Sequence, residues 1–70
     1  MNDSQNLAID SFISLQQARS KKLFRLKIMK VAGEEQSIIN THKKSIVSIE
    51  NKIQWEIRKN EEVFRNQGLI

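Results

Sequence analysis

The clearest hydrophobic pattern in this chain is a line of apolar positions in its C-terminal half. Eight positions follow one another at intervals of three or four residues: Ile39, His42, Ile46, Ile49, Ile53, Ile57, Asn60 and Phe64. This spacing matches one face of an α-helix with about 3.6 residues per turn, whereas a strand would alternate at every second residue. The sequence therefore predicts a long helix that packs through this face, which we call the isoleucine stripe.

The ends of this long helix are also marked in the sequence. Gly33 breaks the preceding segment, and Ser37 competes with the residues just after the glycine as the N-cap. At the other end, Gly68 is placed to be the left-handed residue of a Schellman cap. In that motif Leu69 would contact Phe64.

The N-terminal segment is apolar on less regular faces. Its first half carries a helical face made of Leu7, Ala8, Ile9, Phe12, Ile13 and Leu15. After Arg19 the register changes, and Phe24, Ile28 and Val31 define the apolar side. This shift indicates a kink near residues 19–22, or apolar contacts on two sides of one helix. A strand over residues 23–31 is the competing interpretation, but one isolated strand would have no sheet to join.

These patterns predict an all-α fold of one domain, residues 1–70. We expect an antiparallel two-helix hairpin, with helices over about 5–31 and 34–67 and a break at Gly33. A chain of 70 residues buries only about 60% of the surface that its unfolded form exposes. It has no cysteine and one histidine, so disulfides and a metal cannot supply the missing stability. We therefore expect a homodimer that forms a four-helix bundle around the isoleucine stripe. The alternative is an extended conformation along a partner.

Three polar or aromatic positions on the long helix call for a role of their own. His42 is expected to be structural, with a pH-sensitive contact as the alternative. Asn60 either sets the register of the packed helices or marks a frayed part of the stripe. Trp55 points nearly opposite the stripe, and we expect it to be buried against another helix, in the hairpin or across the dimer. An exposed Trp55 would instead anchor an interface or stack on a nucleic-acid base.

Charge is concentrated in one short segment. The net charge is +4, and six bases stand together without an acid among them: Arg19, Lys21, Lys22, Arg25, Lys27 and Lys30. We call these residues the basic block. Its simplest explanation is a solvated helix face. As a binding surface it would suit an acidic protein partner first, nucleic-acid phosphates second, and an anionic membrane surface third. No helix-turn-helix spacing accompanies it.

The sequence carries no motif for catalysis. It lacks a Gly-rich phosphate loop, a Cys/His ligand cluster and a Ser/His/Asp set, so we expect no enzyme, cofactor, metal or small-molecule substrate. The start of the chain does not resemble a secretory signal, and apolar runs are too short to span a membrane, so a cytoplasmic location is expected. The richness in Lys, Asn and Ile is compatible with a bacterial or phage genome.

We therefore predict a small, non-enzymatic adaptor, regulator or assembly factor that binds a protein. It would act through helix–helix packing and the basic block, with Trp55 as an additional interface anchor. A helical dimer that binds nucleic acid, with the basic block on phosphates, is the first alternative. A structural subunit of a larger complex is the second.

Overall fold

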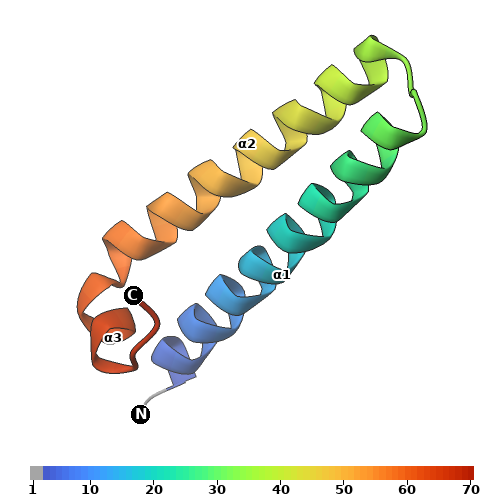
Figure 1. Cartoon of the computed structure of the whole chain (residues 1–70). Coiled ribbons are helices and arrows are strands. Elements are labelled where there is room, and N and C mark those ends of the chain that lie inside the picture. The colour runs from blue at the N-terminus through green and yellow to red at the C-terminus, as the bar shows by residue number, and fades with distance from the viewer. Residues whose placement is uncertain (1–2) are drawn as a thin grey trace.

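The chain folds into two long helices and one short one. The computed structural model describes residues 3–70, which form α1 (Asp3–Val31), α2 (Gln36–Lys59) and α3 (Glu61–Asn66). In Figure 1, α1 and α2 run antiparallel side by side, and α3 folds back at the end where α1 begins. The prediction of an all-α fold is confirmed, and the segment that competed as a strand lies inside α1. The prediction of a single long C-terminal helix is wrong, because two helices occupy that region.

The turn between α1 and α2 is built on Gly33, as the sequence predicts. Gly33 has φ +73°, a conformation that costs glycine little because it has no Cβ. The amide of Glu34 donates to the carbonyl of Met29 at 3.0 Å, and the amide of Gly33 donates to that of Lys30 at 3.3 Å. These are the two hydrogen bonds of a Schellman cap. Glu35 then precedes the first residue of α2, so Ser37 lies inside the helix and is not its N-cap.

Asn60 divides the predicted second helix into α2 and α3. Its backbone has φ −126° and ψ 26°, outside the helical region. Its side-chain amide donates to the backbone carbonyl of Glu56 at 3.1 Å and lies 3.3 Å from the Glu56 carboxylate. Asparagine competes with the helix in this way because its short side chain bonds to nearby backbone groups. Asn60 therefore ends α2 and turns the chain into α3.

The C-terminal cap forms as predicted. Gly68 has φ +71°, the amide of Leu69 donates to the carbonyl of Phe64 at 2.8 Å, and the amide of Gly68 donates to that of Arg65 at 3.1 Å. Both Schellman hydrogen bonds are thus present. Leu69 also packs into the same apolar cluster as Phe64. The cap therefore directs the last residues back onto the core.

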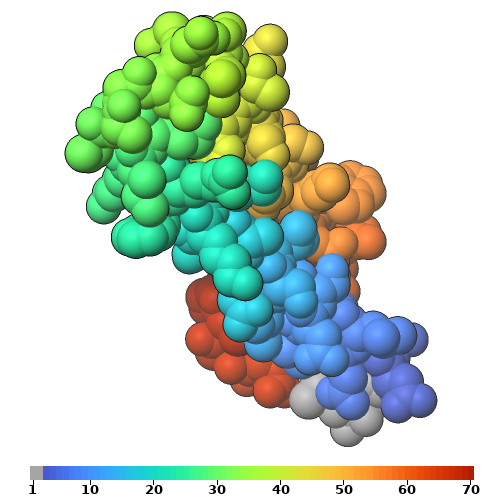
Figure 2. Space-filling view, turned by 90° about the vertical axis from the view of Figure 1, so that its right-hand side faces the viewer, coloured from blue at the N-terminus to red at the C-terminus, as the bar shows by residue number. Residues whose placement is uncertain are grey.

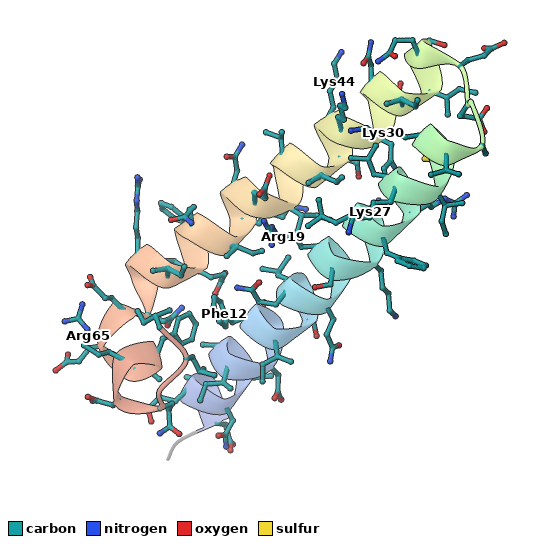
Figure 3. The ribbon with its side chains drawn as sticks, viewed as in Figure 1. Phe12, Arg19, Lys27, Lys30, Lys44 and Arg65 are labelled. Atoms are coloured by element: carbon teal, nitrogen blue, oxygen red, sulfur yellow. The ribbon has the colours of Figure 1, made fainter. Side chains whose placement is uncertain are left out.

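The tightest part of the core lies at the α3 end of the hairpin. Phe12, Ile53 and Phe64 form one buried cluster, and Phe64 is fully inaccessible to solvent. The rings of Phe12 and Phe64 lie 4.5 Å apart between centroids at a tilt of 37°. Figure 3 shows Phe12 reaching from α1 toward the α3 end of the molecule. Towards Gly33 the core narrows to Ile46 and Ile39, which are also buried.

The inner face of α1 differs from the predicted one. Its positions follow a regular three-four spacing and are all buried or half-buried: Gln5, Ala8, Phe12, Leu15, Arg19, Lys22, Leu26 and Met29. Arg19 and Lys22 occupy two middle positions of this inner face. The apolar pattern of the face is therefore interrupted in the sequence. The predicted packing side is wrong, since Phe24, Ile28 and Val31 are 66%, 53% and 91% exposed. The helix is not interrupted where the sequence indicated a kink, because α1 runs unbroken through residues 19–22.

The isoleucine stripe packs within a single chain. Every position of the stripe is buried or half-buried in the monomer, and the contacts that cover it come from α1 and the C-terminal segment. The chain therefore covers this face without a second copy.

Candidate functional site

An open groove runs between α1 and α2 close to the Gly33 turn. It has a volume of about 770 Å³ and is lined by Lys21, Lys22, Arg25, Met29, Ser37, Ile38, Thr41, His42 and Ser45. We call it the basic groove. The Phe12–Phe64 cluster lies at the opposite end of the hairpin. The short helix α3 covers that end and not the end with the Gly33 turn (Figure 1).

The two walls of the basic groove differ in chemistry. Lys21, Lys22 and Arg25 come from α1, and among the described residues that line the groove none is acidic. The α2 wall contributes three hydroxyl side chains instead, from Ser37, Thr41 and Ser45. Cations and hydroxyl groups both bind anionic oxygens, so the groove is suited to carboxylates or phosphates.

The α2 wall is a feature that sequence reasoning missed. Ser37, Thr41 and Ser45 are four residues apart, which places them on one side of a helix. They lie next to the isoleucine stripe, between its members, so the same periodicity that revealed the stripe could have revealed them. Thr41 donates its hydroxyl to the backbone carbonyl of Ser37 at 3.0 Å, so its one hydroxyl hydrogen is used within α2, and Ser37 and Ser45 are the hydroxyl donors of this wall that an anion could use.

The structure separates the basic block into three parts. Lys21, Lys22 and Arg25 line the groove, whereas Lys27 and Lys30 are exposed residues outside its lining. Arg19 lies between the two long helices (Figure 3), where its Nε is 3.1 Å from a carboxylate oxygen of Glu50. Glu50 neutralises Arg19, and the guanidinium is turned into the α1–α2 contact. Half of the predicted basic surface therefore meets at one site.

His42 forms part of the groove and also joins the two helices. Its Nε2 lies 2.8 Å from the backbone carbonyl oxygen of Lys22. A carbonyl oxygen can only accept, so Nε2 carries the proton in this contact. The imidazole is half-buried between α1 and α2. This arrangement fits the structural role that the sequence suggested for His42.

Trp55 lies apart from the basic groove. Its side chain is 59% exposed. The expectation that the hairpin buries Trp55 is therefore wrong. The ammonium group of Lys59 lies 5.9 Å from the centre of the indole ring, at the outer limit of a cation–π contact. Trp55 and the basic groove are therefore separate features of α2.

Over residues 3–70, His, Cys, Asp and Glu side chains nowhere gather in a group of three or more that could hold a metal ion. Likewise, none of the described helices combines the length and apolar character that crossing a membrane requires.

Comparison with protein-family models, curated proteins and solved structures finds no match for this chain.

Proposed function

We propose that this chain is a small non-enzymatic adaptor, regulator or assembly factor of the cytoplasm that binds an acidic segment of a protein partner. The observation that carries the proposal is the basic groove, where Lys21, Lys22 and Arg25 of α1 line the same hollow as the hydroxyl side chains of α2. Met29 and Ile38 add apolar side chains to the lining. A segment that carries both carboxylates and apolar side chains would satisfy both parts of the groove.

The monomer fold also supports an intermolecular role for the groove. The helices cover their own isoleucine stripe within one chain. What the fold leaves open to a partner is the basic groove and the outer helix faces. Sedimentation equilibrium of the purified chain measures whether a second copy is nevertheless bound.

A charge-reversal experiment tests the proposal. Lys21→Glu with Arg25→Glu changes two exposed bases of the groove, and Lys44→Glu with Arg58→Glu changes one exposed lysine and one exposed arginine elsewhere. The probe is a fluorescent Glu-rich peptide that also contains leucines, measured by anisotropy at low and moderate salt. The groove variant should bind at least about tenfold more weakly, which is about 1.4 kcal/mol. Equal weakening by both variants would indicate net charge alone and contradict the proposal.

Nucleic acid is the second candidate, and one observation favours it. Lysine, arginine and serine or threonine hydroxyls are the side chains that most often contact phosphates, and all of them line the groove. Three bases on phosphates would give a slope of about −2.7 in log affinity against log salt on duplex DNA. Binding of a short duplex with that slope, in competition with the peptide, would favour this second function.

A further inference from the structure

The outer face of α1 carries an apolar stripe that nothing in the chain covers. Phe24, Ile28 and Val31 are exposed by 66%, 53% and 91%. At about 100° per residue they fall within about 60° of one another around the helix. Figure 2 views the molecule from the side of α1, and no other helix lies over α1 in that view. We call these three residues the outer stripe.

Positive charge borders the outer stripe on both sides. Lys21 and Arg25, which form one wall of the basic groove, lie along one edge, and Lys27 and Lys30 lie toward the other. All four are exposed, and residues 11–33 contain no acid. The surface is thus an apolar ridge between two rows of cations.

We propose that the outer stripe is the docking surface for an amphipathic helix with acidic edges, supplied by a protein partner. The inference goes beyond the proposed function, because the outer stripe is a second surface of α1 that shares only Lys21 and Arg25 with the basic groove. A helix presents apolar side chains at every third or fourth residue, which matches the spacing of Phe24, Ile28 and Val31. Its glutamates or aspartates would flank that apolar face and meet the lysines and arginines of α1.

A second copy of this chain is a poorer occupant. Two outer stripes packed together would bring lysines and arginines of one copy near those of the other, and like charges oppose association. The stretch of α1 around the outer stripe has no acid that could offset this repulsion, since residues 11–33 contain none. Glu50, Glu56 and Glu61 pair with Arg19, Lys59 and Arg65 of the same chain.

An anionic membrane surface fits the charge but not the shape. A helix that lies in a membrane interface buries its whole apolar face. In α1 that face is divided, because Leu26 and Met29 turn toward α2 while Phe24 and Ile28 turn outward. The remaining outer stripe is narrow, which suits one helix better than a bilayer.

Two labelled peptides of identical composition test the proposal against the full chain. In the first, leucines repeat at three- and four-residue intervals with glutamates beside them; in the second, the same residues are shuffled so that no face is apolar. Binding is measured by fluorescence anisotropy. We expect the amphipathic peptide to bind at least about tenfold more tightly, because only it can bury the outer stripe.

Matched variants locate the binding surface on α1. Phe24→Gln with Ile28→Gln should weaken the amphipathic peptide by at least about tenfold. The control changes Leu7→Gln with Val47→Gln, whose exposures of 68% and 53% match the 66% and 53% of the first pair. The control should change affinity by less than about twofold. Circular dichroism verifies that both variants stay folded, as expected for exposed positions.

The outcomes separate this inference from the proposed function. If both peptides bind equally and only the Lys21→Glu/Arg25→Glu variant weakens them, the acidic segment binds without a helix and the outer stripe is not its surface. If neither peptide binds, both proposals fail. Tighter binding to phosphatidylserine vesicles, or dimerisation that Phe24→Gln abolishes, would replace the partner helix by a membrane or a second copy.

Discussion

Truncation of Phe64 is the most demanding test of the fold. Phe64 is fully buried on α3 and contacts Phe12 of α1, so it fastens the short helix to the hairpin. Phe→Ala substitutions in protein cores cost about 3–5 kcal/mol. At 0.05–0.15 kcal/mol per residue, a chain of 70 residues has a total stability of about 3.5–10 kcal/mol. Phe64→Ala should therefore remove about 30% or more of the stability of the protein.

The chain contains its own control for this experiment. Phe24→Ala makes the same chemical change at a side chain that is 66% exposed, and it should shift stability by no more than about 0.5 kcal/mol. Thermal unfolding followed by far-UV circular dichroism compares the two. A domain of this size loses about 4–8 °C in Tm per kcal/mol, so Phe64→Ala should melt at least about 12 °C lower than the parent.

A second substitution asks whether the loss comes from the contact between the rings. Phe12→Ala completes a double-mutant cycle with Phe64→Ala, and aromatic pairs contribute about 0.5–1.5 kcal/mol beyond their buried area. If Phe64→Ala melts within a few degrees of Phe24→Ala, α3 does not pack on α1 in solution. The reasoning about the core would then be refuted.

Three further experiments probe the turns and the contacts between the helices. Gly68→Ala should cost about 1–2 kcal/mol through the left-handed backbone alone, since no atom lies within 4 Å of the added Cβ; an unchanged urea midpoint would contradict the Schellman cap. His42→Ala should cost about 0.5–1.5 kcal/mol by removing the hydrogen bond between α1 and α2, and a melting temperature equal to that of the parent would show the bond is unimportant. The cycle of Arg19→Gln and Glu50→Gln should give a coupling below about 1 kcal/mol that shrinks with added salt, because both side chains are about two-fifths exposed. A larger, salt-independent coupling would mean that the pair is shielded from solvent.

The sequence predicted the second half of the hairpin better than the first. The isoleucine stripe repeats without interruption, and the positions of Gly33 and Gly68 are set by local backbone chemistry. The break at Asn60 escaped prediction because the three-four spacing continues through it. It depends on one side chain bonding to the Glu56 carbonyl in competition with the helix.

The sequence of α1 alone could not predict which of its faces packs against α2. Its apolar residues lie on two sides of the helix, and the side that packs is decided by what α2 offers. Arg19 is acceptable in the seam because Glu50 stands opposite it, a pairing that only the folded hairpin reveals. Packing through this face leaves Phe24 exposed and divides the basic block. The sequence therefore predicted which segment carries the binding surface, but not which of its residues form that surface.

The uneven core has a consequence for how the hairpin moves. Phe12, Ile53 and Phe64 hold the two helices together at one end, whereas every residue from 30 to 38 is exposed at the other. Local opening costs the least free energy where the fewest apolar contacts are broken. The helix ends around Gly33 should therefore separate and reclose without global unfolding, and their amides should exchange hydrogen faster than those beside Phe12. Since the basic groove lies at this looser end, an incoming segment can widen it at the cost of a local fluctuation.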